Sequence, residues 1–330
     1  MLDVGAVLQI AGEVGKSAAD MLKTLAGVKI VSDLYSRASR WREVRGAAAG
    51  AKELLGLRRP GEGVSYRHDS VHPLFAKGRE LHPDNIAALR ALGVDEVRAA
   101  ARSGVLTVAP SIVTSLNDNL VLIGSPIAEG LSRAVFGYRE LRAGSLELVN
   151  PPVDLPFRHV LSRNVIDTRA QALRYVAGKG RVSRANWQIE SDSEMFVPGV
   201  RTVDRFLDFD YLLISRLRNF LSREALDEGK YIVSIAGCHG TGTRAIEVLL
   251  SDTSTLARIG QLLSKQPAAY QVLLKVGDIH HSARRGSRAR QVELVGEPEV
   301  LTDRRERWEA AVKIADANLR QWIQGAERRA

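Results

Sequence analysis

The amino-acid sequence predicts an α/β fold in which a mixed, mostly parallel sheet carries helices on both faces and follows a helical N-terminal region. In the first quarter of the chain, apolar residues recur with the spacing of a helix. Beyond residue 104 the pattern changes to short β-like runs, several of which are separated by helical segments. Two of these runs, residues 119–123 and 231–236, end in loops of small residues that lead into a helical pattern.

The 330 residues are enough for one large domain or two smaller ones. We expect residues 1–104 to form a helical region for oligomerisation or adaptor contacts, and residues 105–300 to form an α/β ligand-binding domain. Residues 301–330 have the pattern of an amphipathic helix that packs on that domain. Helical patterns also cover residues 126–138 and 244–264. The β-like runs cover residues 105–109, 120–123, 146–149, 211–217, 231–236, 271–276 and 291–295, whereas residues 151–199 show too little periodicity to assign.

The N-terminal region contains the pattern of an a/d helical seam, with a 4-3 spacing sustained through four heptads. Its members are Val4, Val7, Ala11, Val14, Ala18, Met21, Leu25 and Val28. Two interpretations stay open. The seam either packs inside its own domain or joins two copies of the chain, although small residues at several a positions weaken a free-standing zipper.

Composition limits the partners and the setting of the protein. The formal net charge of +9 favours nucleotides, nucleic acid or anionic lipid as partners, but the arginines are widely spread and this charge is equally well explained by compositional bias. Cys238 is the one cysteine, so the chain has no internal disulfide and no cysteine-based zinc site. Without a secretory pattern or an apolar stretch that could span a bilayer, we expect a cytoplasmic protein with no membrane partner.

The loop at residues 237–244 is the strongest local motif. Gly240 and Gly242 allow a close approach of the backbone, and Thr243 suits the N-cap of the next helix. Arg244 would lie in the first helical turn, where its cation opposes the helix dipole and calls for an anion such as a phosphate. The predicted ligand contacts are Gly237, His239, Gly240, Thr241, Gly242, Thr243 and Arg244. A tight turn that uses its glycines for packing is the alternative, and Thr243 in place of the lysine excludes a P-loop.

The loop after residues 119–123 supplies the second half of the predicted pocket, through Gly124, Ser125 and Pro126. Ser125 suits an N-cap and Pro126 the first helical position. Glu129 lies one turn further on, where a carboxylate could act on a sugar or simply complement the helix dipole. Glu129 and His239 are the candidate catalytic residues.

Other polar clusters support less specific interpretations. The neighbours Cys238 and His239 point apart on an extended chain, which argues against a cysteine protease. No metal site is predicted, because the histidines lack a carboxylate at ligand spacing. The densest basic cluster, which could contact phosphates or form a solvated hairpin tip, consists of Arg284, Arg285, Arg288 and Arg290.

Residues 120–137 (LVLIGSPIAEGLSRAVFG) and 210–250 together resemble Rossmann-like nucleotide-ligand domains of bacterial signalling and defence proteins. In those proteins the domain often follows a helical adaptor segment. The resemblance implies sensing or processing of a nucleotide, and it carries over no catalytic residue.

We therefore expect a sensor or effector that binds a nucleotide or another phosphorylated small molecule and couples this binding to self-assembly as a homo-oligomer. The identity of the ligand or cofactor stays open. One alternative is an NAD- or nucleoside-processing enzyme of the glycosidase or hydrolase type that uses Glu129 or His239. A third interpretation, ranked below these, is a nucleic-acid-binding regulator that uses the basic loop at residues 284–290.

Overall fold

The computed structural model describes the core of the chain and part of its N-terminal region. The described residues are 46, 50, 52–53, 55–56, 64–68, 83–92, 116–126, 130–142, 145–161, 187–201, 206–282 and 286–327. The predicted seam at residues 4–28 lies outside them, as do Glu129, Arg284 and Arg285.

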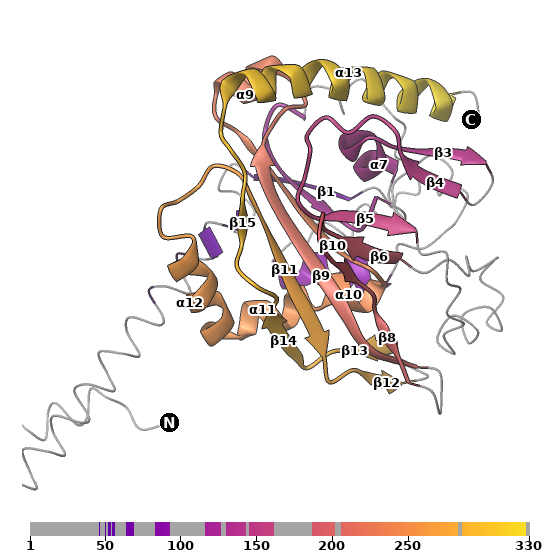
Figure 1. Cartoon of the computed structure of the whole chain (residues 1–330), viewed down its shortest axis with the longest axis vertical. Helices are drawn as coiled ribbons and strands as arrows, with labels where there is room; N and C mark the ends of the chain where they lie inside the picture. The colour runs from indigo at the N-terminus through magenta and orange to yellow at the C-terminus, as the bar shows by residue number, and fades with distance from the viewer. Residues whose placement is uncertain are drawn as a thin grey trace, which may run out of the picture.

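A mixed sheet forms the centre of the molecule (Figure 1). Its main order is β1 (Val64–His68), β2 (Asn119–Ile123), β10 (Tyr231–Gly237), β9 (Leu207–Arg218), β11 (Tyr270–Gly277) and β14 (Gln291–Leu294). Two short strands add to its sides, β15 (Glu299–Val300) beside β11 and β8 (Gly199–Val200) beside β9.

The prediction of a mostly parallel sheet is wrong. Among the strand pairs that the described residues form in this sheet, two are parallel, β1 with β2 and β2 with β10, while β9 and β11 run antiparallel to their neighbours. The connection from β9 to β10 holds a single short helix, α9 (Arg223–Asp227), which is too short for the crossover that parallel neighbours need. β11 reaches β14 through a small hairpin of β12 (His280–Ser282) and β13 (Gly286–Arg288), which also favours an antiparallel pair.

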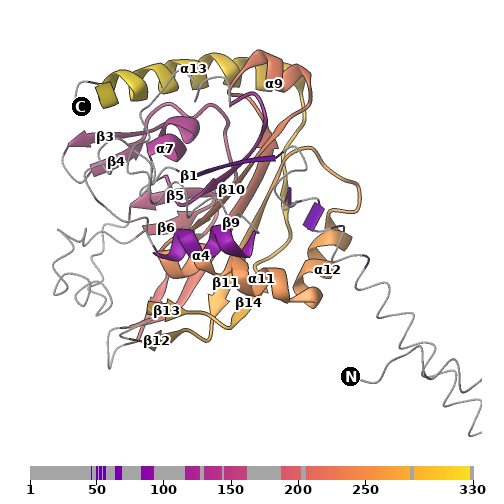
Figure 2. The ribbon, with the colours of Figure 1, turned by 180° about the vertical axis from the view of Figure 1, so that it is seen from behind.

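Helices cover both faces of the sheet, as predicted (Figure 2). Because side chains alternate along a strand, Val121 and Ile123 of β2 join the core of the first face and Leu120 and Leu122 join that of the second. The first face carries α4 (Pro83–Ala91), α10 (Gly240–Arg244), α11 (Ile246–Ser251) and α12 (Thr253–Leu262). The second face carries α7 (Gly130–Phe136) and, packed on it, α13 (Arg305–Glu327).

One helical prediction changes in detail. The segment predicted as one helix over residues 244–264 contains two, α11 and α12, after the end of α10 at Arg244. Asp252 separates them by accepting hydrogen bonds from the N–H groups of Ser254 and Thr255. The C-terminal helix α13 packs on the second core through an apolar stripe, as expected. Its buried members are Trp308, Ala311, Ala315 and Leu319. Among the described residues, no helix combines the length and hydrophobicity that crossing a membrane requires.

The segment that the sequence left unassigned forms much of a cover over the second face. It contributes β5 (Arg158–Leu161), β6 (Trp187–Glu190) and β7 (Met195–Phe196), next to the hairpin of β3 (Tyr138–Arg142) and β4 (Ser145–Leu148). Gln271 of β11 joins this cover to the sheet. Its side-chain oxygen accepts from the Phe157 N–H at 2.7 Å, and its Nε2 donates to the Phe157 carbonyl at 3.1 Å and the Ser215 hydroxyl at 2.8 Å.

Candidate functional site

The two strand–loop units identified in the sequence lie side by side at one edge of the sheet. β2 and β10 are parallel neighbours, and the Gly124 N–H donates to the Ile235 carbonyl at 2.9 Å. β11 runs in the same direction as β10, because both are antiparallel to β9. Its following hairpin β12–β13 therefore extends from the same edge, and β13 packs against α10. In open α/β sheets this carboxyl edge is where ligands bind.

A carboxylate of the protein fills the anion-binding position in the second loop. Asp210 of β9 has no exposed surface, and its Oδ2 accepts from the Gly242 N–H at 2.7 Å and the His239 N–H at 3.2 Å. These N–H groups are the donors that the sequence pattern assigns to a ligand phosphate. No local sequence signal links Asp210 to this loop, because Asp210 lies on β9 and the loop follows β10.

The glycines of the loop permit close packing, which is the alternative that the sequence left open. A Cβ atom on Gly242 would lie 2.3 Å from the Tyr211 carbonyl oxygen, and one on Gly237 would lie 2.3 Å from the Thr243 nitrogen. Thr243 is not the N-cap: it lies inside α10, whose N-cap position is His239, and its buried hydroxyl accepts from the Gly237 N–H at 2.9 Å. This arrangement holds β9, β10 and α10 together.

Arg244 forms ion pairs with two carboxylates of the chain. Its Nε lies 3.1 Å from Oε2 of Glu247, and its Nη1 lies 3.8 Å from Oδ1 of Asp84, which is buried on α4. The Arg244 side chain is only 11% exposed. Two carboxylates therefore already neutralise this cation, and its contact with a ligand phosphate stays a prediction.

His239 is the predicted contact that the structure leaves incompletely bonded. Its Nδ1 lies 3.3 Å from Oδ1 of Asp210. Its Nε2 is buried and has no hydrogen-bond partner. Gly240 beside it is half-buried, and Thr241 is buried.

A pocket with a cavity volume of about 30 Å³, inside a hollow of about 470 Å³ that includes open solvent, lies on the opposite face of the sheet from Asp210. Pro126 and Ala236, one from each strand–loop unit, line it. The sheet also contributes Leu213, Ser215, Ser234 and Gln271. The cover contributes Phe136, Tyr138, Leu148, Pro151, Val153, Asp154, Leu155, Phe157, Arg158 and His159.

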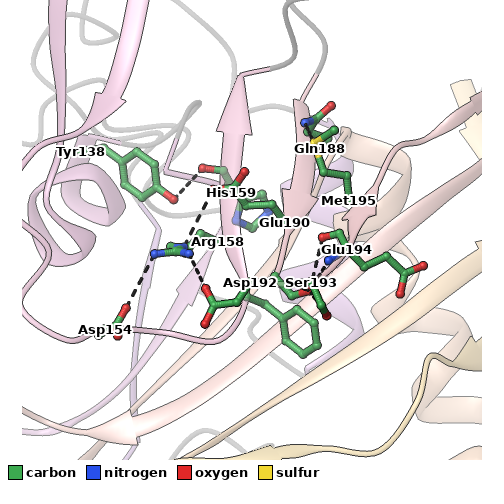
Figure 3. Close-up of polar contacts among 12 residues, drawn as sticks. Tyr138, Asp154, Arg158, His159, Gln188, Glu190, Asp192, Ser193, Glu194 and Met195 are labelled. Atoms are coloured by element: carbon green, nitrogen blue, oxygen red, sulfur yellow. Dashed lines mark hydrogen bonds and ion pairs between the residues drawn. The ribbon is translucent and has the colours of Figure 1, made fainter.

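His159 is the most unusual residue of the pocket lining. His159 is 4% exposed. Burial lowers the pKa of its imidazole from 6.5 to about 4, so the imidazole is neutral at pH 7. Its Nε2 is buried without a hydrogen-bond partner. The Tyr138 hydroxyl donates to the His159 carbonyl at 2.7 Å, which fixes this part of β5, and burial raises the pKa of Tyr138 (Figure 3).

Acidic side chains surround the arginine at the rim of the pocket. Arg158 lies 2.9 Å from Oδ1 of Asp192 and 3.7 Å from Oδ1 of Asp154, with Glu190 at 4.0 Å (Figure 3). The cation is thus already matched by carboxylates. The pocket offers a ligand neutral hydrogen-bonding groups and apolar walls rather than an unpaired positive charge.

The remaining predicted residues are placed as follows. Ser125 is buried, and the described part of the next helix holds its loop, because Nε of Arg133 donates to the Pro126 carbonyl at 3.0 Å. Arg288 and Arg290 are exposed on the hairpin segment that follows β11. Neither arginine lines the pocket.

Within the described part of the chain, no three His, Cys, Asp or Glu side chains are arranged to hold a metal ion. Cys238 is buried, and burial raises the pKa of its thiol, which disfavours the reactive thiolate. No family model, curated protein or solved structure matches this chain.

Proposed function

We propose that this protein binds a small molecule of the nucleotide class, with the uncharged ring and sugar portion of that ligand in the pocket lined by His159. The observation that carries this proposal is a neutral, buried imidazole whose Nε2 has no partner, in a pocket of mixed polar and apolar lining beside the carboxyl ends of two parallel strands. Pockets of this kind, with few converging polar groups, are the usual form of small-molecule sites.

The lining suits a flat heterocyclic ring. Phe136, Tyr138 and Phe157 provide aromatic surface, against which a ring can pack. His159 can donate or accept one hydrogen bond at Nε2, according to its tautomer, and so can pair with a ring nitrogen or a sugar hydroxyl. An unpartnered buried group is costly, and a ligand that bonds to it removes that cost.

The same geometry argues that phosphate groups contribute little to the affinity. The N–H donors of the second loop are taken by Asp210, and Arg244 and Arg158 are paired with carboxylates. A nucleoside and its monophosphate should therefore bind with similar affinity. This refines the sequence-based expectation of a phosphorylated ligand.

We further propose that ligand binding is coupled to self-assembly through the region at residues 1–104, as a sensor or effector would require. The parallel unit β1–β2–β10 is the part of the sheet that supports a Rossmann-like interpretation. The antiparallel strands β9, β11 and β14 restrict that interpretation to this unit.

Mass spectrometry of small molecules extracted from the purified protein tests the proposal. We expect a nucleoside, nucleotide or dinucleotide to co-purify with the wild type and with the control His280→Leu, whose imidazole is exposed. The His159→Leu variant should lose that molecule. An extract without any such molecule, together with no thermal stabilisation by adenosine, guanosine, their phosphates or NAD, would contradict it.

A nucleoside- or NAD-processing enzyme is the second candidate function. The observation that favours it is the contact between His239 and the buried Asp210, because a paired imidazole with a vacant Nε2 is suited to proton transfer.

A further inference from the structure

We propose that Asp210 and His239 form an acid–base centre at the carboxyl edge of the sheet, separate from the pocket lined by His159. In this centre His239 takes a proton from a water molecule or a ligand hydroxyl, and Asp210 orients the imidazole. The proposal goes beyond ligand binding, since it assigns a chemical step to a different face of the sheet.

The position of Asp210 makes it a fixed acceptor. Side-chain alternation places Asp210 on the face of β9 that also carries Leu212 and Ile214, opposite the pocket residue Leu213. Its Oδ1 accepts from the Tyr211 N–H at 2.9 Å, while Oδ2 accepts the two N–H groups of the second loop. These backbone donors hold the carboxylate in one orientation toward His239.

The contact with Asp210 determines the tautomer of His239. A carboxylate can only accept a hydrogen bond, so the Nδ1 atom 3.3 Å from Oδ1 carries the proton. The lone pair of the neutral ring then lies on Nε2, which has no hydrogen-bond partner. The His239 side chain keeps 15% of its surface exposed, while Nε2 itself is buried, so a water molecule or ligand must displace the surface that covers it.

Asp210 and His239 correspond to the orienting acid and the general base of a catalytic triad. The third member of a triad, a nucleophilic hydroxyl, is not supplied by Thr243. The Thr243 hydroxyl cannot serve, because it is buried and accepts from the Gly237 N–H. The attacking oxygen must then come from water or from the ligand. A second observation agrees with a site here: β13, with the exposed Arg288, packs against the helix that follows His239.

The step is a hydrolysis or transfer at an acyl or glycosyl carbon. Nε2 removes the proton from water or a hydroxyl while that oxygen forms a bond to the carbon. The bond from the carbon to its leaving group breaks with its electron pair, and the imidazolium returns the proton to that group. The Asp210 carboxylate stabilises the imidazolium.

Rates of hydrolysis of p-nitrophenyl acetate, adenosine and NAD test the proposal for the full chain. We expect at least one probe to be cleaved faster than in buffer, and His239→Asn to lower that rate about a hundredfold. Asparagine can still donate a hydrogen bond to Asp210, which keeps the fold, and His280→Asn serves as the matched control. Failure to cleave any of the three probes above the buffer rate would overturn the proposal, and so would equal rates for His239→Asn and the wild type.

Nitrogen NMR of the His239 ring separates an acid–base role from a structural one. The wild type should show a protonated Nδ1 and an unprotonated Nε2 at neutral pH, and Asp210→Asn should change this tautomer. A protonated Nε2 in the folded wild type would overturn the assignment. The exposed-histidine variant His280→Asn should keep both the tautomer and the cleavage rate. Loss of nucleoside binding in His159→Leu and loss of cleavage in His239→Asn are separate measurements, so failure of the pocket and failure of this centre are distinguishable.

Discussion

The buried His159 makes the stability of the protein depend on pH. Its folded-state pKa of about 4 lies below the ordinary value of 6.5, so between these values only the unfolded chain binds the proton. Stability conferred by the neutral imidazole is therefore complete above pH 6.5 and is lost as the pH falls toward 4. By linkage the loss amounts to about 3 kcal/mol, since each pKa unit corresponds to about 1.4 kcal/mol.

Urea unfolding at neutral pH and near pH 4 measures this effect. The wild type and the control His280→Leu should both lose stability over this range, whereas His159→Leu should lose about 3 kcal/mol less. The leucine also removes an unpartnered buried nitrogen, so we expect the neutral-pH stability of His159→Leu to equal or exceed that of the wild type. An equal loss in all three proteins would show that His159 is not the titrating group.

Arg244 is expected to stabilise the fold rather than bind a ligand. Removing its guanidinium in Arg244→Ala takes a cation away from Asp84 and Glu247 and should cost about 3 kcal/mol of stability. Arg244→Lys, which keeps the charge, should lose less. If Arg244→Ala left urea unfolding unchanged but abolished nucleotide binding, Arg244 would instead be a ligand contact, as the sequence predicts.

Among the secondary-structure elements, the contact between β9 and the second loop determines how closely α10 can approach the sheet. A methyl group on Gly242 would lie 2.3 Å from the Tyr211 carbonyl and 2.8 Å from Oδ2 of Asp210. We expect Gly242→Ala to destabilise the protein by about 2 kcal/mol or more, because two of the atoms that the methyl group meets, the Tyr211 carbonyl oxygen and the Cα of Gly237, belong to the backbone and cannot move easily. Gly277→Ala at the end of β11 is the matched control, since its new methyl group meets no atom closer than 4.0 Å. Similar unfolding curves for the two variants would contradict this account of the loop.

The sequence predicted the strand–loop units because each is a local signal: an apolar run followed directly by glycine or proline. Their pairing in one sheet followed from the ordinary rules of α/β folds. The role of the second loop could not be predicted, because it depends on Asp210, whose position opposite the loop is determined by the antiparallel pairing of β9 and β10. Likewise, His159 lies in a segment without periodicity, and only the packing of the cover on the sheet makes its imidazole buried and unpartnered.

For the whole molecule, the central prediction outside the described residues is self-association. The seam at residues 4–28 should be buried, either against another copy or against neighbouring helices. Val14→Asp would place a charge in this seam at a cost of several kcal/mol. We expect light scattering to show a lower mass for the variant or thermal unfolding to show lower stability. Unchanged values of both would mean that the seam is exposed to solvent.

Calorimetric titration of adenosine and guanosine, each compared with its monophosphate, tests the proposed binding site most directly. We predict that at least one nucleoside binds the wild type and His280→Leu, that its monophosphate binds with similar affinity, and that His159→Leu binds both about tenfold more weakly. Absence of binding to the wild type would contradict the account. Binding that requires the phosphate and is unaffected by His159→Leu would also contradict it. That result would indicate that the ligand binds at the loop of residues 237–244 instead.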